Sequence, residues 1–134
     1  MGHLQGKVAV ITGAGRGIGR AHALSMAAQG ARLVINDVGC ERDGSGQSSA
    51  AAEVVEEILA TGGDAVVSSD EVGSSTAAHS IMQTAVREFG QLDILVNNAG
   101  ILRDRTLLKM TDEEWDDVVR VHLKGTFCCL RAAA

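Results

Sequence analysis

A glycine-rich run at residues 12–19 has the residue types and spacing of a phosphate-binding turn, and it reads Thr-Gly-Ala-Gly-Arg-Gly-Ile-Gly. It follows directly on the apolar run Val-Ala-Val-Ile of residues 8–11. A strand that breaks into glycines and then begins a helix can hold a pyrophosphate, because glycine permits the tight turn and a close approach of the backbone. The first turn of the helix adds unpaired N–H donors and the positive end of the helix dipole. The segment therefore predicts a dinucleotide-binding turn.

Asp37 supplies a second signal, because it ends another apolar run at residues 31–36. An acid at the end of that strand can accept a hydrogen bond from a ribose hydroxyl, and it would repel the extra phosphate of NADP. Arg16 favours the opposite choice, since a cation inside the glycine loop can pair with a 2′-phosphate. An unpaired carboxylate beside a phosphate costs more than a flexible arginine contact gains, so we expect NAD as the cofactor.

A third signal is the sequence Asn-Asn-Ala-Gly at residues 97–100, which follows the apolar run 92–96. Small residues there let the backbone lie against a ribose, while an asparagine amide can tie neighbouring strand ends together. Asp70, just beyond the short apolar run 65–68, is placed to accept a hydrogen bond from an adenine amino group. All three signals follow predicted strands.

Alternating strands and helices must position these residues. We expect strands at residues 7–12, 31–37, 65–68 and 92–97, helices at 17–29, 48–61 and 76–89, a last helix from 112, and a loop at 38–46. Helical crossovers return each strand parallel to the last one. We therefore predict an α/β fold, a Rossmann-type doubly wound parallel sheet with strand order 3-2-1-4 and its ligand above strands one and four. Residues 1–134 would form one dinucleotide-binding domain.

Two helices carry predicted apolar faces. The helix at 48–61 is expected to bury Val54, Val55, Ile58 and Leu59. The last helix begins with a capping box at residues 111–114 and carries one stripe, made of Trp115, Val118, Val119, His122, Leu123, Phe127 and Leu130. On this stripe we interpret His122 as a satisfied core residue. Strand 92–97 would be an unpaired apolar edge and the stripe would lack a covering helix, so we expect marginal stability or association of the chain.

Composition excludes several classes of protein. The chain has 134 residues, is 46% apolar and 22% charged, and can bury a core. Its net charge of −5 argues against a nucleic-acid partner. No apolar stretch approaches the roughly 20 residues that span a bilayer, so we expect no membrane partner, and the N-terminus lacks the apolar region of an export signal. The three cysteines, Cys40, Cys128 and Cys129, lack metal-ligand or redox spacing, so we expect no metal site and a reducing compartment. The adjacent pair, Cys128 and Cys129, is interpreted as small apolar filler.

The sequence resembles the short-chain dehydrogenase/reductase family in three places: the glycine pattern at 12–19, Asp70, and residues 97–100. The resemblance implies an oxidoreductase that transfers hydride between NAD and a secondary alcohol or ketone, and that forms a homo-oligomer. It implies a coenzyme site made of Gly13, Arg16, Gly17, Ile18, Gly19, Asp37, Asp70, Glu71, Asn98, Ala99 and Gly100.

A closer resemblance, at residues 36–39, 56–58, 98–105 and 120–125, is to the (3R)-hydroxyacyl-CoA dehydrogenase units of type 2 peroxisomal multifunctional enzymes and their bacterial relatives. It implies a 3-hydroxyacyl-CoA substrate, with a peroxisomal location in a eukaryote and a cytoplasmic one in a bacterium. Arg103 and Arg105 then either face a CoA phosphate, or pair with Asp104 or lie in solvent.

The family's catalytic serine, tyrosine and lysine are not matched in this chain, which has no tyrosine and whose last serine is Ser80. The resemblance implies that the three catalytic residues lie beyond Ala134. Residues 1–134 would then be the coenzyme half of a longer enzyme and contain no catalytic residue. An alternative is a non-catalytic NAD-binding or interaction module, if the natural chain ends at Ala134. A different nucleotide fold, such as a methyltransferase, gives no reason for the 97–100 sequence.

Overall fold

The computed structural model describes residues 2–39 and 49–134. Their elements, in chain order, are β1 (Val8–Ile11), α1 (Gly17–Ala28), β2 (Arg32–Asn36), α2 (Ala50–Ala60), β3 (Asp64–Ser68), α3 (Ser75–Phe89), β4 (Ile94–Val96), the short 3₁₀ helix η1 (Leu107–Lys109), α4 (Asp112–Val119), the π-helical turn η2 (Arg120–Lys124) and α5 (Gly125–Ala133). All strand pairings are parallel and the order is β3-β2-β1-β4, which confirms the predicted topology. Most of the predicted loop at 38–46, with Cys40, lies outside the described residues.

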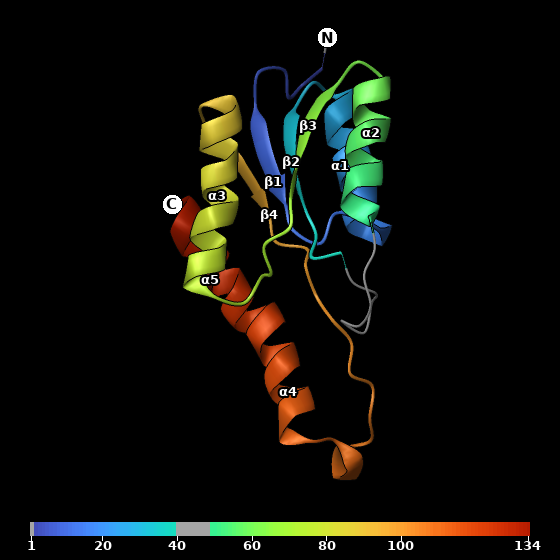
Figure 1. The fold of residues 1–134 in the computed structure, drawn as a ribbon, viewed down its shortest axis with the longest axis vertical. Helices are drawn as coiled ribbons and strands as arrows, with labels where there is room; N and C mark the ends of the chain where they lie inside the picture. The colour runs from blue at the N-terminus through green and yellow to red at the C-terminus, as the bar shows by residue number, and fades with distance from the viewer. Residues whose placement is uncertain (1, 40–48) are drawn as a thin grey trace.

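Helices cover both faces of the sheet, with α1 and α2 on one side and α3 and α5 on the other (Figure 1). Side chains alternate between the faces along each strand. Ile11, Leu33 and Ile35 pack toward α2, whereas Val10 and Val34 pack toward α3 and α5. Because β1 and the centre of β2 are buried on both faces, their sequences are continuous apolar runs rather than alternating ones.

The cysteines of α5 are part of this core. Cys128 and Cys129 are buried in the cluster that contains Val10 and Val34, and burial raises the pKa of the Cys129 thiol. A thiol with a raised pKa carries little thiolate and is a poor nucleophile. The prediction that this pair is apolar filler is confirmed.

The predicted bounds of the strands and of the first three helices lie within two residues of the observed ones, and the predicted buried face of α2 was wrong at one residue. The fourth strand is Ile94–Val96 rather than 92–97, and just before it the side chain of Asp93 accepts the N–H of Val8 at 2.8 Å. The face of α2 buries Val54, Val55 and Ile58, but Leu59 is half exposed. At about 100° per residue, Leu59 lies about 40° beyond Val55 and thus outside the arc that Val54, Ile58 and Val55 bury.

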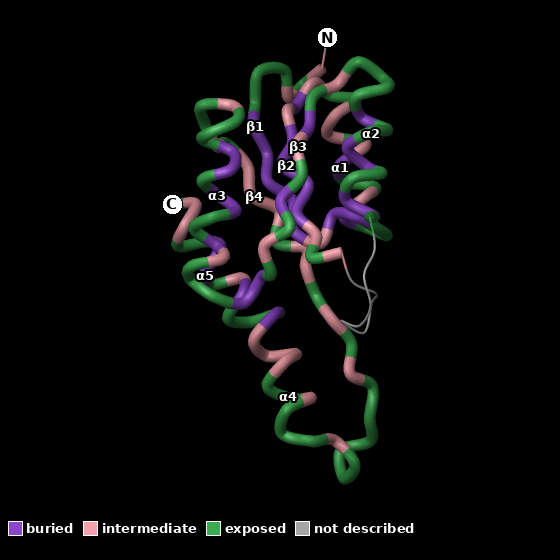
Figure 2. Tube along the Cα trace, viewed as in Figure 1, coloured by how far each residue is buried: buried purple, intermediate pink, exposed green. Residues whose placement is uncertain are grey.

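The last predicted helix is divided into α4, η2 and α5. Its capping box is present, with the Thr111 hydroxyl accepting from the Glu114 N–H at 3.1 Å and the Glu114 carboxylate accepting from the Thr111 N–H at 3.1 Å. The predicted stripe is not buried: Trp115, Leu123, Phe127 and Leu130 are exposed. Figure 2 shows the contrast between the buried β1 and β2 and the segment at 101–119, which is exposed or intermediate along its length. Among the helices of the described residues, none combines the length and apolarity needed to cross a membrane.

Candidate functional site

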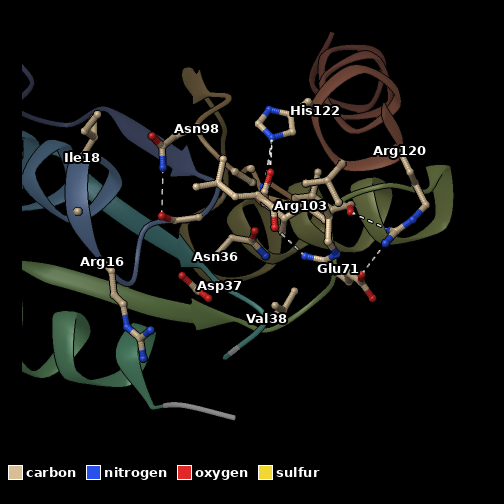
Figure 3. A pocket seen from close by; sticks show the side chains of 18 residues that line it. Arg16, Ile18, Asn36, Asp37, Val38, Glu71, Asn98, Arg103, Arg120 and His122 are labelled. Atoms are coloured by element: carbon tan, nitrogen blue, oxygen red, sulfur yellow. Dashed lines mark hydrogen bonds and ion pairs between the residues drawn. The ribbon is translucent and has the colours of Figure 1, made fainter. Parts of the chain in front are cut away.

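A cavity of about 540 Å³ opens at the carboxyl ends of β1, β2 and β4. Figure 3 shows Asn36 and Asp37 between Arg16 on one side and the pair of Arg120 and Glu71 on the other. The predicted coenzyme residues that line it are Gly13, Arg16, Gly17, Ile18, Asp37, Glu71, Asn98, Ala99 and Gly100. Two predicted residues, Gly19 and Asp70, do not line it. The cavity therefore lies at the switch point of the sheet, where the sequence predicts a ligand.

The glycine loop fits tightly against its neighbours. Gly13 has φ +62°, and a Cβ on it would lie 2.8 Å from the Cα of Ala99. A Cβ on Gly15 would lie 2.7 Å from a carboxylate oxygen of Asp37. Gly19 is buried, and a Cβ there would overlap the Asn98 amide and the Gly13 carbonyl. The glycines thus keep the loop close to the strand ends, and Gly19 acts in packing behind the cavity.

The helix that starts at this loop differs from two others in the chain. In α3 and α4, Ser74 and Thr111 cap the first turn with a side-chain oxygen. Within the described residues, α1 has no such side-chain cap at Arg16 and no acid in its first turn. Gly17 and Ile18, the first residues of α1, line the cavity, so the helix presents its N-terminal donors and the positive end of its dipole there, which suits an anionic ligand.

Asn98 ties the ends of β1 and β4 together, as the sequence predicts. Its side-chain amide donates to the carbonyls of Thr12 at 3.1 Å and Gly13 at 3.0 Å. In return, the Thr12 hydroxyl accepts from the backbone N–H groups of Asn98 and Ala99, both at 3.0 Å. Sequence reasoning did not identify this role of Thr12, although a polar residue at the buried end of a strand requires such partners.

Asp37 is bonded to the glycine loop itself. Its carboxylate accepts from the N–H of Gly15 at 3.0 Å and from the N–H of Gly39 at 3.1 Å. The side chain is half-buried and lines the cavity beside Arg16. Asp37 thus fixes the loop in place and presents negative charge where a ribose hydroxyl could donate.

Asp70 lies beside the cavity, next to Glu71. Its carboxylate accepts from the Ser80 hydroxyl at 2.9 Å, and its backbone carbonyl accepts from the Asn36 side chain at 2.9 Å. Glu71, by contrast, lines the cavity and forms an ion pair with Arg120 at 3.1 Å. Sequence reasoning found both acids, but it did not find Asn36, Ser80 or Arg120 as their partners.

The interpretation of His122 as a core residue was wrong. The side chain is exposed, lines the cavity and lies over Gly100. Its Nε2 lies 3.0 Å from the carbonyl oxygen and 3.2 Å from the nitrogen of Ile101. The stripe as a whole is uncovered, since Trp115, Leu123 and Phe127 are exposed as well, so His122 has no core to enter.

The two arginines after the 97–100 sequence form ion pairs with α4, and Arg105 also donates to the backbone carbonyl of Asp104 at 2.9 Å. Arg103 lies 3.7 Å from Asp117, and Arg105 lies 3.3 Å from Glu114. Arg103 lines the cavity. In the part of the chain that the structure describes, no group of three or more His, Cys, Asp or Glu side chains could hold a metal ion.

Comparisons with known proteins agree with this geometry. A family model described as short chain dehydrogenase matches residues 7–134. The chain is 50% identical over 96% of its length to peroxisomal multifunctional enzyme type 2 of Drosophila melanogaster, of which it covers 21%. It is 47% identical over 98% of its length to hydroxyacyl-CoA dehydrogenase ChsB1 of Mycobacterium tuberculosis, of which it covers 40%.

Among solved structures, carveol dehydrogenase from Mycobacterium avium in complex with NAD matches 99% of the chain with a TM-score of 0.88 and 33% identity, and the match covers 50% of that protein. The chain therefore spans half or less of each of these relatives. The similarity includes the whole cavity, since every residue that lines it lies within 7–134.

Proposed function

The chain belongs to the short-chain dehydrogenase family, and from this premise we propose that its cavity binds NAD in a protein that transfers hydride between NAD and a secondary alcohol or ketone. One observation carries the proposal. The glycine loop has no room for Cβ atoms at Gly13 or Gly15, and it leads into a helix without a side-chain cap that opens on the cavity. Backbone N–H groups of such a loop and helix start, lying directly beside the cavity, suit a pyrophosphate.

The other lining residues fit the remaining parts of the dinucleotide. Asp37 would accept from the adenosine ribose, and Asp70 and Glu71 would lie at the adenine. Residues 98–100 would lie against the ribose on the nicotinamide side, where Asn98 keeps the strand ends together. The bound coenzyme supplies the hydride acceptor. Asp37 favours NAD over NADP, because a 2′-phosphate would meet its carboxylate.

The proton transfer that accompanies hydride transfer is not assigned to a residue of this chain. The family resemblance implies a tyrosine for that step, and the 134 residues contain none. We therefore assign coenzyme binding and orientation to the described residues, and we propose the complete reaction only for the natural protein.

The substrate proposed is a 3-hydroxyacyl-CoA. It is supported by the similarity to a hydroxyacyl-CoA dehydrogenase, at 47% sequence identity, and to a peroxisomal multifunctional enzyme, at 50%. The same similarity supports a peroxisomal location if the source is eukaryotic, and we propose a cytoplasmic one if it is bacterial. The exposed apolar stripe that includes Trp115, Leu123 and Phe127 supports a homo-oligomer.

Coenzyme binding is tested by titrating the full natural chain with NADH, following the fluorescence of the reduced nicotinamide. We expect saturable binding, and weaker binding of NADPH. Equal or tighter binding of NADPH would show that Arg16 outweighs Asp37. Binding of S-adenosylmethionine in place of NADH would favour a methyltransferase and end the proposal.

Turnover separates the enzyme from a non-catalytic NAD-binding module. We expect NADH to form when the natural protein receives NAD and a 3-hydroxyacyl-CoA. The absence of tyrosine favours the module if the natural protein has an intact mass near 13.9 kDa. In that case NADH should bind and no substrate should be oxidised.

A further inference from the structure

Asp70 is held from two directions by residues that are not part of the predicted coenzyme site. The Ser80 hydroxyl donates to its Oδ2 at 2.9 Å, and the Asn36 side-chain amide donates to its backbone carbonyl at 2.9 Å. These residues come from α3 and from the end of β2, so two separate elements fix one acid at the margin of the cavity.

Asn36 is an unusual residue for the end of a central strand. It is 1% exposed, lines the cavity, and donates to the carbonyl and hydroxyl oxygens of Ser68 at 3.3 and 3.1 Å as well as to Asp70. A buried side-chain amide destabilises the folded state unless its hydrogen bonds are formed. Here these bonds determine the path of residues 68–70 as the chain leaves β3.

Ser80 binds the side-chain carboxylate of Asp70, whereas Asn36 binds its backbone carbonyl. The helix that carries Ser80 is fixed against the sheet by Ile81 and Ala85, which are fully buried, so the hydroxyl projects from a rigid element. Within the described residues, Ser80 is the one side chain bonded to the Asp70 carboxylate. A carboxylate has two oxygens, and with Oδ2 bonded to Ser80 the other oxygen remains to accept a further hydrogen bond.

We propose that Ser80 and Asn36 are positioning residues, which orient Asp70 so that its second carboxylate oxygen accepts from the exocyclic amino group of the coenzyme adenine. This inference rests on the proposed NAD site and adds the residues that give it selectivity for adenine. An oriented carboxylate selects a base that donates at this position. Hypoxanthine presents a carbonyl oxygen there instead, which the carboxylate repels.

The test measures dissociation constants in the full natural chain for NADH and for reduced nicotinamide hypoxanthine dinucleotide. Ser80→Ala should weaken NADH binding about threefold to tenfold, the range expected for one net hydrogen bond. It should change binding of the hypoxanthine coenzyme by less than about twofold. Ser80→Thr, which retains the hydroxyl, should restore NADH binding. Thr76→Ala, at an exposed position one turn earlier in α3, serves as the matched control and should bind both dinucleotides normally.

A second comparison does not depend on the analogue. In an Asp70→Ala background, Ser80→Ala should cause no further loss of NADH affinity, because its partner is already absent. Asn36→Ala tests the second contact. Its unfolding midpoint is measured alongside the dissociation constants, because Asn36 is buried, and its loss of affinity should likewise be larger for NADH than for the hypoxanthine coenzyme.

Equal losses for both dinucleotides, no loss in Ser80→Ala, or additive losses with Asp70→Ala would each overturn the inference and leave a purely structural bond. In all these outcomes the unsubstituted protein still binds NADH, so the proposed function stands. If the unsubstituted protein binds no NADH, both the proposed function and this inference fail.

Discussion

The two sides of the cavity are held by different kinds of interaction. On the glycine-loop side, Thr12 is 1% exposed and shares hydrogen bonds with Asn98, while Asp37 accepts backbone N–H groups. On the side of residues 101–105 and η2, the contacts include surface ion pairs. Arg120 is 37% exposed and its partner Glu71 63% exposed. Buried hydrogen bonds fix geometry, whereas exposed ion pairs contribute little and weaken with salt. The first side is therefore preformed, and the second is adjustable.

The largest effect is expected for Gly13→Ala, on the preformed side. The new Cβ combines a positive φ with a 2.8 Å approach to the Cα of Ala99, and backbone cannot move aside cheaply. We expect unfolding to become easier by about 3 kcal/mol, from the left-handed conformation and the overlap together. The measurement is the denaturant midpoint.

Gly62→Ala is the matched control for that substitution. Gly62 also has a positive φ, of +88°, but a Cβ there meets nothing within 4 Å. It should cost only about 1 kcal/mol. Equal costs at Gly13 and Gly62 would show that the close approach to Ala99 is unimportant.

Asn98→Ala should have the next largest effect. It leaves the carbonyls of Thr12 and Gly13 without their side-chain donor, and half-buried acceptors that lose a partner cost about 1–3 kcal/mol. NADH affinity should fall with it, because the two strand ends are no longer tied. Asn97→Ala, at the exposed neighbouring position, should stay within about 0.5 kcal/mol. A comparable loss at Asn97 would contradict the role assigned to Asn98.

On the adjustable side, Arg120→Gln should change stability by less than about 1 kcal/mol. It removes the ion pairs with Glu71 and Asp117, both of which are solvent-exposed enough for water and salt to screen them. The difference between the two proteins should shrink further between low and high salt. A large, salt-independent loss would mean that both sides of the cavity are equally rigid.

The smallest effect is expected at the opposite end of the sheet, where Asp93 accepts the Val8 N–H. This hydrogen bond, followed by one from Gln91, holds the pKa of the Asp93 carboxyl below its ordinary value. Since the pKa is lowered in the folded state, the contribution is present above the ordinary carboxyl pKa and is lost as pH falls through the folded one. Asp93→Asn should therefore differ from the unsubstituted protein at neutral pH and converge with it in acid. Unfolding midpoints measured across the acid range check this.

The sequence predicted the preformed side well because its signals are local. The glycine loop, Asp37 and residues 97–100 each follow an apolar run, and parallel strands bring their carboxyl ends together. The strand order followed from the same alternation of strands and helices. These features depend on near neighbours in the chain.

Three other residues that act through distant partners were missed. Thr12 bonds to Asn98, Asn36 to Asp70 and Arg120 to Glu71, and no local pattern indicates these pairs. The interpretation of His122 as a core residue was wrong for a related reason. An apolar stripe indicates a face that can be buried, but it does not indicate which element covers that face, and here Trp115 and Phe127 are exposed like His122.

The buried thiols of α5 can be used to measure how often this helix opens. Cys128 and Cys129 are at most 2% exposed, and the raised pKa of Cys129 leaves it protonated near neutrality. A thiol-alkylating reagent can reach them only when α5 separates from the sheet. The rate at which the peptide containing Cys128 and Cys129 gains alkyl mass then measures how often this element opens. Measured with and without NADH, that rate tells whether filling the cavity reduces the opening of the helix that follows η2.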